Sequence, residues 1–172
     1  MVKTILIPTD FSDSTIDGIR YVAAQLADHP VHCYLLHIVE HSASRTLYSA
    51  ETETAGRPET GEQVLGKLRR MIDGFTLLSG MTLEPAVRYG EPWREIVRFA
   101  QGMKADLIVS AAGSGSETSG GSGHRVTDMI ARFSPVPVLM VKPGTVPASP
   151  VPWEEFRDQV HIQYEGRHEP NR

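Results

Sequence analysis

The sequence lacks several features that mark large classes of proteins. Its one cysteine, Cys33, excludes an internal disulfide and favours a reducing compartment, so we expect a cytoplasmic protein. No apolar run approaches the ~20 residues that cross a bilayer. The residues after Met1 also turn polar too soon for a secretory signal. We therefore expect no membrane partner.

The sequence also has no large excess of charge of one sign. The 17 basic and 21 acidic residues give a net charge of −4, and no run of lysine and arginine forms a basic patch. Proteins that bind nucleic acids through the phosphate backbone need such a patch. We therefore expect no nucleic acid partner.

The motifs of common enzyme classes are also missing. The chain has no GxxxxGK[ST] phosphate loop, no GxGxxG after its first apolar run, and no GxSxG around a serine nucleophile. The spacing of His32, His37 and His41 does not place all three on one face of a strand, and no cysteine or carboxylate cluster accompanies them. We expect no catalytic residues and no metal site, hence a protein that is not an enzyme.

Short apolar runs are what the sequence does contain. Most of them are nearly continuous rather than alternating, as in strands of a parallel sheet that is covered on both faces. The third run alternates more and contains Pro85, which indicates an edge strand. The five predicted strands are Val2–Pro8, Val31–Ile38, Thr82–Arg88, Asp106–Ala111 and Pro137–Lys142.

Apolar residues at helical spacing fill the segments between these runs. Ser12 or Asp13 can cap the first helix, and Pro92 suits the first turn of the third. Alternating strands and helices favour right-handed parallel crossovers. The sequence thus predicts one α/β domain with a doubly wound, five-stranded parallel sheet and helices on both faces. The helical stripes cover residues 16–26, 64–78, 93–100 and 126–133.

Three segments do not fit this alternation. Residues 41–61 are a polar connection, and residues 113–123 are almost wholly glycine, serine and threonine. We assign residues 1–143 to the α/β domain and residues 144–172 to a polar C-terminal tail. The tail either docks through its few apolar residues or stays disordered.

Two segments are candidates for a binding site, because open α/β sheets bind ligands beyond the carboxyl ends of their strands. The first is PTDFS, Pro8–Ser12, and the second is the Gly113–Gly123 loop. Such a loop can cradle an anion with backbone N–H groups, or it is a plain connector. Asp10 can accept a hydrogen bond from a ligand amine or ribose, or it can cap the first helix. We favour the ligand role, since Ser12 and Asp13 are alternative caps.

Several segments together resemble the universal stress protein family. The opening ILIPTDFSDSTIDGIRYVAAQLA, the following LLHIVE, and the later VRYGEPWREIVRFAQGMKADLIV and VTDMIARFSPVPVLMVK are similar to that family in order and spacing, from Val2 to about Pro143. The resemblance implies strand order 3-2-1-4-5, a homodimer, and a role in stress tolerance rather than a committed metabolic reaction. We expect the dimer to form through the fifth strand, whose edge would otherwise leave apolar residues in water.

Many members of this family bind ATP through G-x2-G-x9-G-[ST] after the fourth strand, together with an Asp that closes the first. Here the Asp corresponds to Asp10, but the motif positions hold Ala111, Ser114, His124 and Arg125. Gly113 and Gly115 flank the second position. The resemblance therefore implies a binding site made of Pro8, Thr9, Asp10, Ile38, Ala111, Gly113, Ser114, Gly115, His124, Arg125 and Val126.

Two functions follow from these substitutions. Larger residues where backbone must approach phosphate disfavour a triphosphate, which predicts a non-catalytic, dimeric binding or signalling module of the stress response. The alternative is a member that binds an adenine nucleotide, ATP or AMP, through a remodelled phosphate loop. A hydrolase or nucleotidyl-transferring enzyme on the same scaffold has little support, because fold alone does not decide function.

Overall fold

Strands and helices alternate along the chain. The structure is a computed structural model that describes residues 2–26, 30–40, 59–75, 80–111 and 122–142; for residues 26 and 122–125 it describes the backbone alone. The strands pair in parallel in the order β3-β2-β1-β4-β5, which confirms the expected fold and strand order. The elements are β1 (Thr4–Pro8), α1 (Asp13–Leu26), β2 (Val31–Val39), α2 (Gly61–Asp73), β3 (Met81–Tyr89), α3 (Pro92–Gly102), β4 (Leu107–Ala111), α4 (Ser122–Phe133) and β5 (Val138–Val141).

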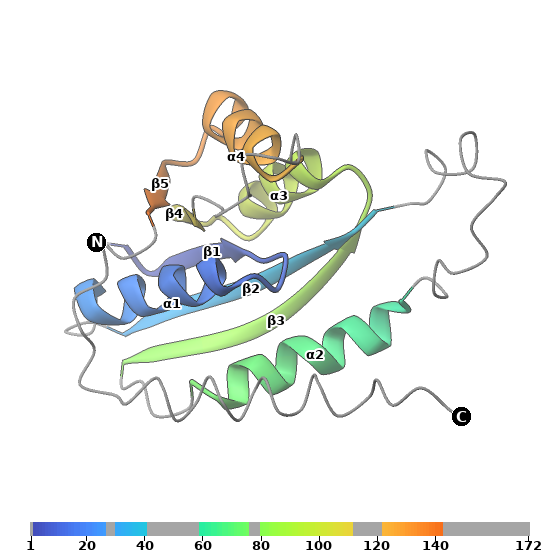
Figure 1. Cartoon of the computed structure of the whole chain (residues 1–172). Helices are drawn as coiled ribbons and strands as arrows, with labels where there is room; N and C mark the ends of the chain where they lie inside the picture. Colours follow the sequence, from blue (N-terminus) through green and yellow to red (C-terminus); the bar gives the residue numbers. More distant parts are fainter. Residues whose placement is uncertain (1, 27–29, 41–58, 76–79, 112–121, 143–172) are drawn as a thin grey trace, which may run out of the picture.

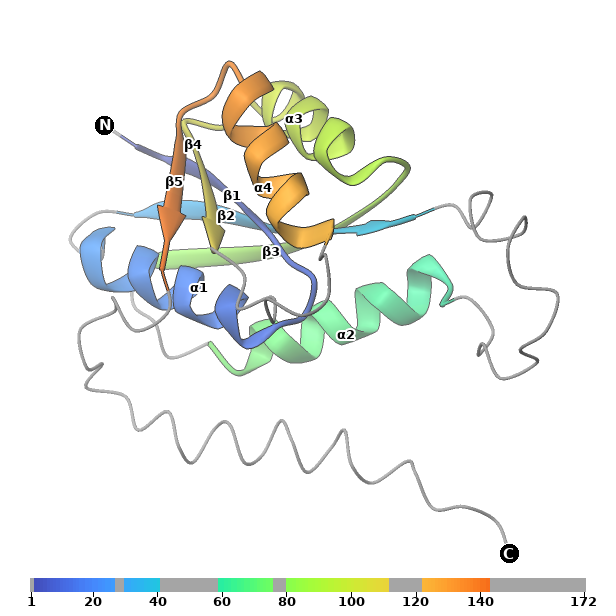
Figure 2. The ribbon, with the colours of Figure 1, turned by 45° about the horizontal axis from the view of Figure 1, so that its top comes forward.

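Helices cover both faces of the sheet. Figures 1 and 2 show α1 and α2 on one face and α3 and α4 on the other. Ile19 of α1 and Leu68 of α2 are fully buried in the core of the first face, whereas Ile96 of α3 and Ile130 of α4 are buried in that of the second. This arrangement is the doubly wound sheet that the alternation predicts.

The middle strands are apolar on both sides. Ile5, Leu6 and Ile7 of β1 are buried, as are Ile108 and Val109 of β4. The predicted edge strand β3 does lie at one edge, where each of its residues is partly buried or exposed. The apolar pattern therefore reported correctly that β1 and β4 are covered on both faces, but it was wrong for the edge strand β5, where Met140 is 46% exposed.

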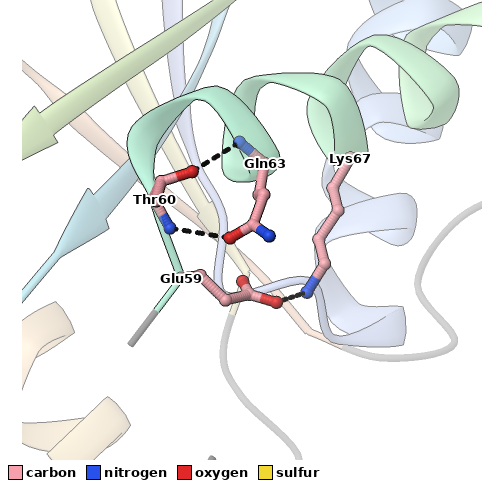
Figure 3. Close-up of polar contacts among 4 residues, drawn as sticks. All are labelled: Glu59, Thr60, Gln63 and Lys67. Carbon is pink, nitrogen blue, oxygen red and sulfur yellow. Dashed lines mark hydrogen bonds and ion pairs between the residues drawn. The ribbon is translucent and has the colours of Figure 1, made fainter. Parts of the chain in front are cut away.

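The start of α2 is set by local hydrogen bonds (Figure 3). The Thr60 side chain accepts a bond from the Gln63 backbone N–H at 3.3 Å, and the Thr60 N–H donates to Gln63 Oε1 at 2.9 Å. This capping box satisfies two backbone donors that a helix start leaves free. Lys67 adds an ion pair with Glu59. The end of the polar connection, at Thr60, thus caps the start of α2.

Two helix boundaries differ from those that the apolar stripes predict. Helix α2 ends at Asp73, and Phe75 fills the core from the turn that follows, with its N–H bonded to the Ile72 carbonyl at 2.8 Å. Helix α4 begins at Ser122, so the last two residues of the predicted Gly113–Gly123 loop are helical. An apolar stripe reports burial and not backbone conformation, which explains both differences.

Other predicted segments lie outside the described residues. They are Leu78, residues 113–121 of the Gly/Ser loop, residues 41–58 of the polar connection and the tail from residue 144. Among the helices that the structure describes, none combines the length and apolar character needed to cross a membrane.

Candidate functional site

A cavity of about 230 Å³ opens at the carboxyl ends of β1, β2 and β4. Strands β1 and β4 are neighbours here, although the chain visits β2 and β3 between them. This is the point where strand order reverses, and where open α/β sheets bind ligands. The predicted site residues that line the cavity are Pro8, Thr9, Asp10, Ile38, Ala111 and Val126.

The structure describes only the backbone of two of the remaining predicted site residues and none of the other three. Gly113, Ser114 and Gly115 lie outside the described residues. His124 and Arg125 belong to the first turn of α4, where the structure describes the backbone alone. Val126, the residue that follows them in α4, lines the cavity.

Hydroxyl groups dominate the buried polar part of the cavity. Within the described ranges, all of the buried polar residues are serines or threonines, and all of them line this one cavity: Thr9, Ser14, Thr15, Ser110 and Thr127. Thr9 Oγ1 lies 3.0 Å from Thr15 Oγ1, and Ser110 Oγ lies 3.4 Å from Thr127 Oγ1. A hydroxyl can both donate and accept, so these pairs can turn toward a polar ligand.

Asp10 lies at the cavity and orders the turn before α1, but it does not cap that helix. Its Oδ1 accepts a hydrogen bond from the Ser12 backbone N–H at 3.0 Å, which orders the turn before α1. The side chain is nevertheless exposed at the cavity, and among the described residues its Oδ2 accepts no hydrogen bond. One oxygen of the carboxylate therefore orders the turn, and the side chain as a whole stays exposed at the cavity.

The next residue, Phe11, adopts an uncommon backbone conformation. Its φ of 65° is in the left-handed region, which costs a residue with a side chain about 1–2 kcal/mol. The Phe11 N–H donates to Thr9 Oγ1 at 3.0 Å, and the Phe11 ring lies 4.6 Å from the His37 ring between centroids. The ammonium of Lys67 lies 5.7 Å above the Phe11 ring. Surrounding contacts therefore hold the turn in this conformation.

His37 of β2 connects the turn to the sheet. Its Nδ1 lies 2.8 Å from the carbonyl oxygen of Thr9, and its side chain also lines the cavity. From the sequence, His37 was considered only as part of a metal site and was not included among the predicted site residues. In the structure, His37 contacts both residues that flank Asp10, Thr9 and Phe11.

Sequence reasoning missed most of the polar lining. Ser14, Thr15, His37, Ser110 and Thr127 were not among the predicted site residues, although each lines the cavity. A signal was available for Ser110, because a hydroxyl at the end of the apolar run LIVSA is unusual in a buried strand. Thr127 carries a similar signal on the apolar stripe of VTDMI.

Other ionisable groups are placed away from this chemistry. Burial raises the pKa of the Cys33 thiol to about 12, so this cysteine is not a nucleophile at neutral pH. His32 Nε2 pairs with Glu84 at 3.0 Å, near the opposite end of β2 from the cavity. In the part of the chain that the structure describes, no three metal-ligating side chains of His, Cys, Asp or Glu come together.

Known proteins match this chain over most of its length. The family model for the universal stress protein family matches residues 1–142. Universal stress protein MJ0531 of Methanocaldococcus jannaschii is 28% identical over 151 residues, which cover 83% of each chain. The solved structure of MJ0577 from the same organism superimposes with a TM-score of 0.65 at 25% identity, over 84% of this chain and 99% of that one.

A second solved structure contains a ligand. It is a universal stress protein in complex with cAMP, with a TM-score of 0.60 at 21% identity, over 82% of this chain and 97% of that one. At this identity, the likeness shows a shared fold.

Proposed function

This chain belongs to the universal stress protein family, and from this premise we propose that it is a non-catalytic module that binds an adenine mononucleotide between β1 and β4. The observation that carries the proposal is the cavity at the strand-order reversal, which is lined by buried hydroxyls and by the exposed Asp10. Apolar contact from Ile38 and Val126 suits a base, while hydroxyls and a carboxylate suit a ribose.

A ligand with one phosphate suits this site better than a triphosphate. The cavity of about 230 Å³ is small compared with the ~300–1,000 Å³ of most small-molecule sites. The N-terminus of α4 offers backbone N–H groups for one anionic group. In the sequence, Ala111, His124 and Arg125 replace the small residues that bring backbone close to a phosphate chain. The cAMP complex gives a relative of the same fold that holds a mononucleotide.

The lining favours binding over turnover. Thr9 and Thr15 pair with each other rather than with a base, and the Nδ1 atom of His37 is occupied by the Thr9 carbonyl. A nucleophile needs a base within hydrogen-bond reach to be activated. We therefore propose that the protein acts in stress tolerance by binding its nucleotide, and that the bound state is the signal.

Calorimetric titration of the purified chain with AMP, cAMP and ATP tests this function. We expect AMP or cAMP to bind and ATP to bind more weakly. Asp10→Asn keeps an oxygen for the Ser12 N–H but removes the charge, so it should weaken AMP binding by about tenfold or more. Asp13→Asn is the matched control, because Asp13 is exposed in the first turn of α1 and does not line the cavity.

The outcomes separate clearly. The site is supported if Asp10→Asn weakens AMP binding while Asp13→Asn changes it by no more than about twofold, or ~0.4 kcal/mol. Failure of every adenine nucleotide to bind would refute the function, and tight ATP binding would refute the mononucleotide preference.

We also propose that two copies of the chain pair along β5. This strand is at the edge of the sheet, and Met140 is 46% exposed there. An edge with apolar side chains and free backbone groups is usually paired or covered, and a two-fold contact is the commonest closed arrangement. Sedimentation of the full chain and of a chain that ends at Gly144 tests the pairing. A full chain that is monomeric, with a shortened chain that dimerises, would instead indicate that Trp153 and Phe156 of the tail cover this edge.

A further inference from the structure

We propose that His37 is a positioning residue for the nucleotide site, which holds the Asp10 carboxylate in its binding orientation. The proposal rests on the proposed function for its ligand, but its structural basis is independent of any ligand. His37 contacts the residue before Asp10 through a hydrogen bond and the residue after it through a ring contact. Asp10 therefore lies in the middle of a turn, and His37 contacts the residue on each side of it.

The first contact acts through the peptide plane. The Thr9 carbonyl and the Asp10 N–H belong to one planar peptide unit. A hydrogen bond that fixes the Thr9 oxygen therefore also fixes the orientation of the Asp10 N–Cα bond. His37 Nδ1 lies 2.8 Å from that oxygen. The Thr9 N–H donates to the Leu36 carbonyl at 2.8 Å, so β2 holds Thr9 by both of its backbone groups.

The second contact stabilises the left-handed residue. Phe11 has a φ of 65°, and its ring lies 4.6 Å from the His37 ring at an interplanar angle of 39°. Once Phe11 is held in this conformation, the Ser12 N–H reaches Asp10 Oδ1 at 3.0 Å. Loss of the hydrogen bond to Thr9 together with the ring contact therefore releases the turn and, with it, the orientation of the carboxylate.

The hydrogen bond also defines which side chains can replace His37. A carbonyl oxygen only accepts, so Nδ1 of His37 must carry the proton. Asparagine can place an N–H donor at nearly the same distance from the backbone as Nδ1. Glutamine places its donor one bond further out, and leucine has none.

The first experiment compares three substitutions of His37 that differ in where they place a hydrogen-bond donor. AMP affinity of the full chain is measured for His37→Asn, His37→Gln and His37→Leu. We expect His37→Leu and His37→Gln to weaken binding by about tenfold, the value of one hydrogen bond, and His37→Asn to remain within about threefold of wild type. The matched control is His32→Leu on the same strand, whose partner Glu84 lies away from the cavity, and it should bind as wild type does. Equal losses in all three His37 variants would overturn the proposal.

A second experiment separates positioning from direct contact, since His37 also lines the cavity. In an Asp10→Ala background there is no carboxylate left to orient. If His37 acts through Asp10, then adding His37→Leu changes AMP affinity no further, whereas in the wild-type background it costs about tenfold. A full tenfold loss in both backgrounds would mean that His37 touches the nucleotide itself, and would overturn the positioning role.

A third measurement needs no ligand. The Ser12 amide is bonded to Asp10 Oδ1, so its hydrogen exchange, followed by NMR, reports on the turn. We expect exchange to be about tenfold faster in His37→Leu and His37→Gln, and near wild type in His37→Asn. If this pattern holds but AMP does not bind wild type, the proposed function fails while His37 still orders the turn. Exchange that is the same in all variants would overturn the inference, and His37→Gln preserves the test if His37→Leu does not fold.

Discussion

The middle of the sheet and its carboxyl edge are built from different chemistry. Ile7 of β1 and Val109 of β4 are buried among apolar side chains, yet Thr9 and Ser110, one or two residues further on, are buried hydroxyls at the cavity. Apolar burial stabilises the first region, whereas hydrogen bonds satisfy the buried hydroxyls of the second. The comparison teaches that apolar packing and the polar cavity lie within one or two residues of each other on the same strands, so neighbouring substitutions test them separately.

The largest expected effect concerns the cysteine in the middle of β2. Burial raises the pKa of Cys33 from 9.0 to about 12, which lowers the thiolate population about a thousandfold at pH 8. Labelling with a disulfide reagent should therefore be about a thousandfold slower for the native chain than in urea. As a control, Asp10→Cys adds a second thiol at the exposed turn, and this one should react quickly without urea. A native Cys33 that labels within tenfold of its unfolded rate, ~1.4 kcal/mol, would contradict the contrast between the two regions.

Truncation of an apolar side chain in the middle of β4 is expected to have the next largest effect. Ile108 is fully buried between β1 and β5, so Ile108→Ala should lower the free energy of unfolding by about 2–5 kcal/mol. Met103→Ala is the control, because Met103 is 37% exposed, and it should change stability by no more than about 0.5 kcal/mol. Urea unfolding measures both. Equal costs for the two variants would show that burial in the sheet is not what stabilises the fold.

A smaller effect is expected at the carboxyl edge. Thr9→Val keeps the shape but removes the oxygen that accepts from the Phe11 N–H and pairs with Thr15, so we expect a loss of about 1–3 kcal/mol of stability. Ser110→Ala should cost less, because its bond to Thr127 is long at 3.4 Å. If urea unfolding finds Thr9→Val as stable as wild type, the cavity hydroxyls serve binding alone and not the fold.

The smallest effect is expected at the opposite, amino-terminal end of the strands. Backbone N–H groups of Thr4 and Lys3 donate to the Asp106 carboxylate at 2.9 and 2.8 Å, and these bonds lower its pKa. A lowered pKa means that this stabilisation is present above the ordinary carboxyl pKa of ~3.9 and is lost as the pH falls through the folded value. The stability difference between wild type and Asp106→Ala should thus be constant near neutral pH and shrink below about pH 4. A difference that stays constant down to pH 2.5, measured by thermal unfolding, would contradict this assignment.

The fold was largely predictable because its signals are local. Continuous apolar runs identified the strands with ends that differ by a residue or two, and the alternation around Pro85 identified the edge strand. Pro92 begins α3 as expected. The errors fall where an apolar side chain is buried outside a helix, as at Phe75, or where a helix begins before its first buried residue, as at Ser122.

The order of elements, the burial of the middle strands and the turn around Asp10 follow from the sequence alone, since each depends on neighbours along the chain. Only the tertiary structure decided which hydroxyls meet and that His37 reaches the Thr9 carbonyl. Thr9 and His37 are far apart in the chain, and parallel pairing of β1 with β2 alone brings them together. Periodicity reports which side of an element is buried, but hydrogen bonds depend on distances and directions between elements, which exist only once the sheet has formed.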